Sequence, residues 1–176
     1  MNQRAISLLA AFAIAIALFG VSARPSSAAT LPRLEADALG GTHVVLPTDA
    51  AGKPLIVLIA YTRESGHDLK AWARALMDDR ATDAATLYVV VVADRIALSS
   101  RRHIRSVVEG AAVGTKEQID RNVLITFSGD GWRELMAPGD KRAPGVLVCD
   151  GRGDVMYAKR TSYSAQSVAE VEKMVR

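Results

Sequence analysis

The stretch LIVLIAYTRESGHDLKAWARALM, residues 55–77, decides the fold of this 176-residue chain. Residues 55–60 are all apolar, which is typical of a β-strand buried on both faces of a sheet. Beyond the polar turn 61–66, apolar residues recur at the spacing of one helix face: Leu69, Trp72, Ala73, Leu76 and Met77. Strand, turn and helix form half of a βαβ unit, and open α/β sheets bind ligands at the carboxyl ends of their strands. The turn is therefore the expected functional site.

The rest of the pattern predicts one α/β domain over residues 30–176. Further strands are expected at residues 43–46, 87–92, 123–127, 146–149 and 155–159, after an extended lead-in at 30–38. Helices are expected at about 65–79, 99–112 and 164–175, with a short amphipathic segment at 132–136 and a loop at 113–122. Parallel strands joined through a helix need cover on both sheet faces, which predicts a central mixed sheet between two helical layers. In the second helix Ile104, Val107, Val108 and Ala111 are expected to face inward.

The N-terminus has the composition of a secretory signal peptide. Arg4 precedes an apolar run at residues 5–21, and small residues follow it. We interpret residues 1–29 as a signal peptide that is cleaved after Ala28 or Ala29, which predicts a periplasmic or secreted protein. The alternative is an uncleaved anchor, since the run falls just under the roughly 20 apolar residues that span a bilayer. Contact with a membrane is expected only through such an uncleaved signal.

Charge and histidine content exclude two classes of function. The signal carries two arginines and no acid, so Lys+Arg falls from 22 to 20 against 19 Asp+Glu and the formal net charge falls from +3 to +1. Such a balance gives no support to nucleic-acid binding. His43, His67 and His103 are isolated, without a His or Cys partner at metal-ligand spacing. We expect no metal and no cofactor.

Cys149 is the only cysteine, so the chain has neither an internal disulfide nor a pair of thiols. It ends the apolar run 146–149, and a free cysteine in such a run is typically a buried small hydrophobe. The alternative, a reactive thiol, stays open at this point.

The order of elements, with Ala143-Pro144 directly before the hairpin, resembles the thioredoxin-like superfamily, in particular its peroxiredoxin and exported TlpA-like branch. The resemblance rests on the strand and turn at 55–65, on Ala143-Pro144, and on VLVCDGRG at 146–153. It covers roughly residues 31–175. It implies that the Ala143–Pro144 bond is cis and faces the turn, and that the adjacent backbone edge pairs with an extended polypeptide segment.

The thiols of this superfamily are missing from the turn. Its C-x-x-C falls on Thr62-Arg63-Glu64-Ser65, and the T-x-x-C of peroxiredoxins puts Ser65 in the cysteine position. A helix N-terminus can lower a cysteine pKa from about 8.5 to between 3.5 and 7.5, whereas a hydroxyl starts several units higher and cannot form a disulfide. Thiol–disulfide exchange and peroxide reduction are therefore excluded at this turn. Ser65 fits a helix N-cap better than a hydrolase nucleophile.

A second resemblance covers residues 31–72. The lead-in L-P-x-L, the pattern G-x-x-V-x-L-P and the K-x-W of the helix are similar to cysteine-free relatives that are linked to ATP synthase assembly. This resemblance implies a protein partner within a membrane complex under assembly.

The expected function is thus an exported, non-redox binding or assembly module without cysteines in its turn, rather than an enzyme. The residues expected to hold the extended segment are Tyr61, Thr62, Arg63, Ser65, His67, Ala143 and Pro144. A basic group on the second helix and the segment before it is either a solvated face or a docking patch for an acidic partner or anionic lipid: Arg95, Arg101, Arg102 and Arg105. The alternatives are a peroxiredoxin-like enzyme that uses Cys149, and a decayed enzyme.

Overall fold

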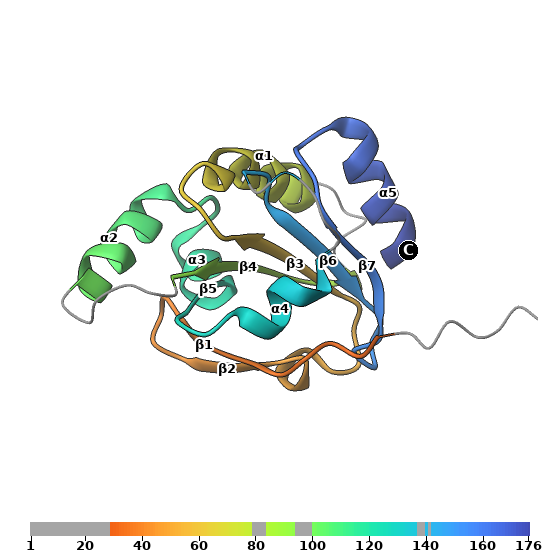
Figure 1. Ribbon diagram of the computed structural model, residues 1–176, viewed down its shortest axis with the longest axis horizontal. Coiled ribbons are helices and arrows are strands. Elements are labelled where there is room, and N and C mark those ends of the chain that lie inside the picture. The colour runs from red at the N-terminus through yellow and green to blue at the C-terminus, as the bar shows by residue number, and fades with distance from the viewer. Residues whose placement is uncertain (1–28, 79–83, 94–99, 137–139, 141) are drawn as a thin grey trace, which may run out of the picture.

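A seven-stranded mixed sheet forms the centre of the computed structural model, which describes residues 29–78, 84–93, 100–136, 140 and 142–176 (Figure 1). The strands are β1 (Leu34–Ala38), β2 (His43–Leu46), β3 (Leu55–Ala60), β4 (Thr86–Val92), β5 (Val123–Thr126), β6 (Gly145–Cys149) and β7 (Val155–Arg160). Their order across the sheet is β2-β1-β5-β4-β3-β6-β7. The helices are α1 (Ser65–Asp78), α2 (Arg101–Ala111), α3 (Lys116–Asn122), α4 (Asp130–Leu135) and α5 (Ala165–Val175), with a 3₁₀ turn η1 (Thr48–Ala50).

Strand β3 lies near the middle of this sheet and is buried along its whole length. It pairs in parallel with β4 and antiparallel with β6, so the predicted mixed sheet is confirmed. Its side chains alternate between two cores, as a strand covered on both faces requires. Ile56 and Leu58 pack in one core with residues of α1 and α5, while Val57 and Ile59 pack in the other core with Trp132 of α4.

The predicted loop at residues 113–122 was wrong, because residues 116–122 form α3. Thr115 caps this helix: its hydroxyl accepts from the Gln118 amide at 3.3 Å, and the Gln118 side chain accepts from the Thr115 amide at 2.9 Å. Two donors that the first helical turn leaves unpaired are satisfied in this way. The sequence signal for this helix start was T-x-x-Q at residues 115–118. It was overlooked because the polar composition of the segment favoured a loop.

Helix α2 contacts the domain through a narrower face than expected. Ile104 and Val108 pack against the core, but Val107 is 55% exposed. The Arg105 side chain donates hydrogen bonds to the carbonyls of Leu39 and Ala38. This contact fixes the helix at the end of β1 and leaves Val107 outside the contact face.

At least one residue of the predicted basic docking patch has a structural role. Arg95 lies outside the described residues, as does the side chain of Arg101, and Arg102 is exposed. Arg105 ties α2 to the β1 end by hydrogen bonds to two carbonyls. One of the four arginines thus has a structural role, and a docking function for the patch stays a prediction.

The predicted signal peptide lies almost wholly outside the described residues, which begin at Ala29. The carbonyl of Ala29 accepts from the Val155 amide at 2.8 Å, and Thr30 forms a bridge with Asp154. The first described residues thus already pair with the start of the edge strand β7. None of the helices within the described ranges is long and apolar enough to cross a membrane.

We expect Gly40→Ala to lower the free energy of unfolding by about 1–3 kcal/mol. The Gly40 amide donates to the Asp120 carbonyl at 2.7 Å, and a Cβ at residue 40 would lie 2.8 Å from that carbonyl oxygen. Because the opposing atom belongs to the backbone, the close approach of β1 to α3 would have to open. The measurement is urea unfolding followed by circular dichroism.

Gly110→Ala is the matched control for this prediction. A Cβ at Gly110 meets no atom within 4 Å, and the residue lies in α2. Alanine in a helix is more favourable than glycine by about 0.5–1 kcal/mol, so the control should unfold at slightly higher urea than the natural chain. Equal stability of Gly40→Ala and the natural chain would contradict the observed contact between residues 40 and 120.

Candidate functional site

The turn between β3 and α1 is closed by two hydroxyl residues that hydrogen-bond to each other. The Ser65 amide donates to the Thr62 Oγ1 at 3.2 Å, and the Thr62 amide donates to the Ser65 Oγ at 3.2 Å. The Ser65 hydroxyl also donates to the Thr62 carbonyl at 2.7 Å. Thr62 is therefore the residue that caps α1, and Ser65, three residues on, completes a reciprocal capping arrangement. The interpretation of Ser65 as the N-cap was therefore wrong in position, because the capping oxygen belongs to Thr62 and the Ser65 hydroxyl bonds back to Thr62.

The two hydroxyls differ in accessibility. Thr62 is exposed, whereas Ser65 is 0% exposed and its hydroxyl proton is already donated to a carbonyl. His67 is exposed and lies in the first turn of α1. A serine nucleophile needs an accessible oxygen and a general base within hydrogen-bond reach. The Ser65 oxygen is not accessible, so the turn has the geometry of a structural cap.

The segment before β6 lies against the turn, as expected. Gly145 pairs with Ile59 of β3, and a Cβ at Gly145 would lie 3.3 Å from the Tyr61 ring. Hydrogen bonds from its own backbone and from the Thr62 side chain lower the pKa of Glu64, and the charge of Arg142 lowers it further. The structure thus brings together the turn and the residues around Ala143 and Pro144, although the two segments lie far apart in the chain.

The Ala143–Pro144 bond is not cis, which corrects the prediction drawn from the resemblance. The cis X-Pro bond within the described ranges is Leu46–Pro47, at the opposite end of β3. Asp140 forms the turn before Pro144: its carbonyl accepts from the Ala143 amide at 3.0 Å, and its carboxylate accepts from the Arg142 amide at 2.8 Å. The chain therefore completes its change of direction before Pro144 and enters β6 directly.

This turn also limits strand addition at the site. The Ala143 amide is bonded to Asp140, and the Pro144 carbonyl accepts from the Thr161 amide at 3.1 Å. Ala143 itself is only 3% exposed. Two backbone groups that could have paired with an extended segment are thus already occupied, so side chains must supply much of any contact.

Two arginines that the sequence analysis missed surround Tyr61. The Arg160 guanidinium carbon lies 4.5 Å from the centroid of the Tyr61 ring, and that of Arg133 lies 5.3 Å from it. The Tyr61 hydroxyl donates to the Trp132 carbonyl at 3.3 Å. Burial raises the pKa of Tyr61 to about 12, although the charges of Arg160 and Arg133 act to lower it. The ring is therefore neutral at physiological pH and presents its face to both cations.

The strand pairing places Arg160 in this cluster. The β6–β7 register places Arg160 opposite Gly145, and Gly145 lies opposite Ile59, two residues before Tyr61. The pairing next to the turn, Cys149 with Val155, would by itself put Lys159 opposite Gly145, and a register shift between Val148 and Cys149 brings Arg160 there instead. Arg133 comes from α4, across the β5–α4 connection, and no local pattern indicates its place.

Cys149 lies at the other end of β3 from the turn, opposite Leu55. It is 0% exposed, and burial raises the pKa of its thiol to about 12, with smaller contributions from the Asp150 and Asp154 charges. At pH 8 only about one molecule in ten thousand then carries the reactive thiolate. The interpretation of Cys149 as a buried hydrophobe is confirmed.

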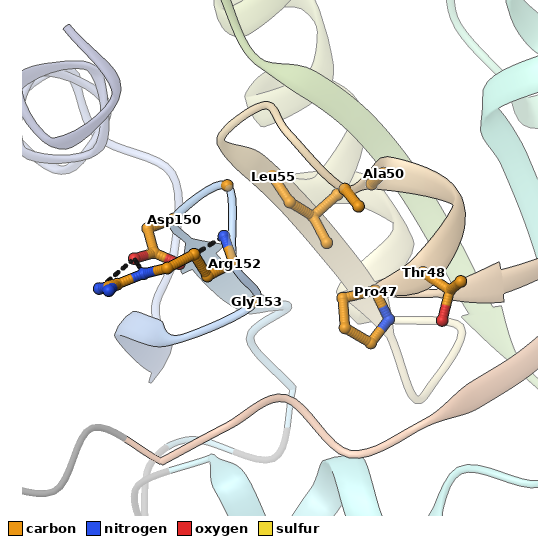
Figure 2. A pocket seen from close by; sticks show the side chains of 9 residues that line it. Pro47, Thr48, Ala50, Leu55, Asp150, Arg152 and Gly153 are labelled. Carbon is orange, nitrogen blue, oxygen red and sulfur yellow. Dashed lines mark hydrogen bonds and ion pairs between the residues drawn. The ribbon is translucent and has the colours of Figure 1, made fainter.

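A pocket of about 190 Å³ lies at this same end of the sheet, between the Pro47 segment and the β6–β7 turn (Figure 2). Pro47, Thr48 and Leu55 line it on one side, and Asp150 and Arg152 line it on the other (Figure 2). The Asp150 carboxylate accepts from the amides of Arg152 at 2.8 Å and Asp154 at 3.0 Å. The Asp150 carboxylate in this pocket thus stabilises the β6–β7 turn. Within the ranges given above, no group of three or more His, Cys, Asp or Glu side chains could hold a metal ion.

Comparison with known proteins identifies the fold. Neither a family model nor a curated protein matches the chain. Among solved structures, the thioredoxin domain of a thiol-disulfide oxidoreductase from Bacteroides vulgatus matches with a TM-score of 0.56 and 16% identity, over 86% of this chain and 99% of that one. The exposed lipoprotein thioredoxin of Streptococcus pneumoniae matches with a TM-score of 0.58 and 16% identity, over 81% and 99%. The protein has a thioredoxin-like fold.

An uncharacterized thioredoxin-like protein from Porphyromonas gingivalis shares the fold at 23% identity, with a TM-score of 0.55 over 83% of this chain and 89% of that one. Identities this low show the architecture alone. In this chain the turn between β3 and α1 carries the hydroxyl residues Thr62 and Ser65 and no cysteine. The chemistry of the site has to be argued from those residues.

Proposed function

We propose that this protein is an extracytoplasmic, non-redox binding module that holds an extended polypeptide segment. The segment would lie across the turn at residues 61–67 and against Ala143 and Pro144. The observation that carries the proposal is the reciprocal hydrogen bonding of Thr62 and Ser65. These hydrogen bonds close the turn without a thiol, so the site can bind but cannot exchange electrons through the turn.

The alternative, an enzyme that uses its single thiol, draws no support from the position of Cys149. The thiol is buried and lies beside Leu55, at the far end of β3 from Thr62. A peroxidatic cysteine needs an accessible thiolate of low pKa, and the pKa of Cys149 is raised to about 12. A decayed enzyme would also lack these properties, and it differs from a binding module in having no ligand.

The grip would come mainly from side chains, since two backbone groups at the Ala143–Pro144 edge are occupied. Arg63 and His67 are exposed at the start of α1, and Tyr61 is half-buried beneath the arginines. An aromatic ring with guanidinium groups on its face is a typical anchor in protein interfaces. The turn can thus supply both an apolar contact and charged hydrogen-bond donors.

We further propose that the protein is exported and that its partner belongs to a membrane complex. The N-terminal signal pattern supports export, and a structural neighbour is an exposed lipoprotein. The resemblance of residues 31–72 to relatives linked to ATP synthase assembly supports a segment that belongs to a membrane complex under assembly.

The test is an unbiased selection of peptides followed by mapping of the binding site. Blocked random peptides of about ten residues, long enough for one extended strand, are selected against the folded protein. Amide chemical-shift changes for the selected peptides should map to residues 61–67 and 142–145. Selection of no peptide tighter than about 1 mM, or shifts confined to the pocket at Pro47, would contradict the proposal.

A further inference from the structure

We infer that the bound segment carries an acidic side chain whose carboxylate is held by Arg160 beside Tyr61. This inference rests on the proposed function and adds the chemistry of the ligand. It starts from an unusual arrangement, in which two guanidinium groups contact one aromatic ring.

Arg160 is the cation of this cluster that lacks a carboxylate partner within the described residues. It is partly buried at the end of β7, and the described residues place no carboxylate within 4.0 Å of it. Its contact within those residues is the Tyr61 ring, at 4.5 Å. A partly desolvated guanidinium gains from a carboxylate that replaces its lost water, and its planar donors fit the two carboxylate oxygens. The aromatic contact holds these donors in place before the ligand arrives.

Arg133 contributes a second positive charge at the same ring, at 5.3 Å. Its ion pair with Asp130, at 3.4 Å, is made by a carboxylate that is 87% exposed, and such pairs contribute little in water. The Arg133 charge adds to the positive potential that a carboxylate meets as it approaches Arg160 beside the Tyr61 ring.

The position of the pair fits a polypeptide ligand. Arg160 lies opposite Gly145, directly after Pro144, so its guanidinium borders the proposed path of the segment. A nucleic acid or another polyanion is disfavoured, because the chain without its signal carries a formal net charge of only +1. An Asp or Glu side chain in an extended segment is the anion that this site fits.

The experiment compares peptide pools and then single peptides. Selection from the blocked random library should enrich Asp or Glu at one position with the natural protein, and the enrichment should vanish with Arg160→Gln. For the tightest peptide, replacing its acidic residue by the neutral amide should weaken binding about tenfold to hundredfold, as expected for a charge-assisted pair. With Arg160→Gln both peptides should bind equally, and Arg160→Lys should restore part of the difference.

Arg152→Gln is the matched control, since Arg152 is an exposed arginine in the β6–β7 turn at the opposite end of the sheet. It should leave the enrichment and the affinities unchanged. A second arm gives the amide-substituted peptide a free C-terminal carboxylate; full recovery of affinity would show that the site binds a chain terminus and would overturn the inference. The two peptides are also compared on the natural protein, which needs no variant. The inference can therefore be contradicted even if Arg160→Gln does not fold.

The outcomes separate the two proposals. Peptides that bind at the turn without acidic enrichment, or with equal affinity after amide substitution, would overturn this inference and leave the proposed function standing. Failure to select any peptide would overturn both.

Discussion

The double variant Thr62→Cys/Ser65→Cys is expected to show disulfide-exchange activity at its turn. The backbone already places an exposed residue at 62 and a buried residue at 65 around the first turn of α1. At the N-terminus of a helix a thiol pKa near 7 is ordinary, which raises the thiolate fraction at pH 7 from about 3% to about half. The exposed thiol at position 62 would attack a substrate disulfide, and the thiol at position 65 would release the mixed disulfide by forming an internal bond.

Insulin reduction with dithiothreitol as electron donor measures this gain. The double variant should accelerate insulin precipitation well above the blank, whereas Thr62→Cys alone should stop at mixed disulfides because it lacks the second thiol. Loss of the reciprocal hydroxyl hydrogen bonds should also cost about 1 kcal/mol of stability in the reduced form. The double variant could form its internal disulfide and still precipitate insulin no faster than the blank. That result would contradict the view that the missing thiols of the turn prevent disulfide exchange.

Trp132→Ala is expected to produce the largest loss of stability, about 3–5 kcal/mol. Trp132 is 1% exposed and fills the core on the α4 face of the sheet. Its indole donates to the Pro32 carbonyl at 2.8 Å, and its own carbonyl accepts from the Tyr61 hydroxyl. The substitution therefore opens a cavity, frees the N-terminal segment and removes support from the ring that holds both arginines.

Urea unfolding measures this loss, and Trp132→Phe is the control. Phenylalanine keeps most of the packing and loses the indole hydrogen bond, so a smaller loss of about 1–2 kcal/mol is expected. A loss below about 1 kcal/mol for Trp132→Ala would mean that Trp132 is not a core residue.

The fold could be predicted because its signals are local. The apolar run at residues 55–60 specified a strand buried on both faces, and the stripe that begins at Leu69 specified the helix that covers it. The turn at 150–153 specified the hairpin. Each pattern is set by a few neighbouring residues, and all of them agree on one topology.

The site was predicted only in part. The turn and its contact with the Ala143–Pro144 segment follow from the strand order. Three features depend on tertiary contacts between distant residues: the isomer of the bond before Pro144, the exposure of Val107, and the approach of Arg133 to Tyr61. Arg160 could not be placed from the turn at 150–153 either, because a register shift between Val148 and Cys149 moves its pairing with Gly145 by one residue.

The central claim is that this thioredoxin-like scaffold binds without exchanging electrons, and turnover by the natural chain tests it most directly. Hydroperoxide consumption and insulin reduction are measured side by side for the natural protein and for Cys149→Ser, with dithiothreitol present. Because the thiol is buried and its pKa is raised to about 12, both proteins should run at the rate of the protein-free blank. Turnover by the natural protein that disappears in Cys149→Ser would contradict the account.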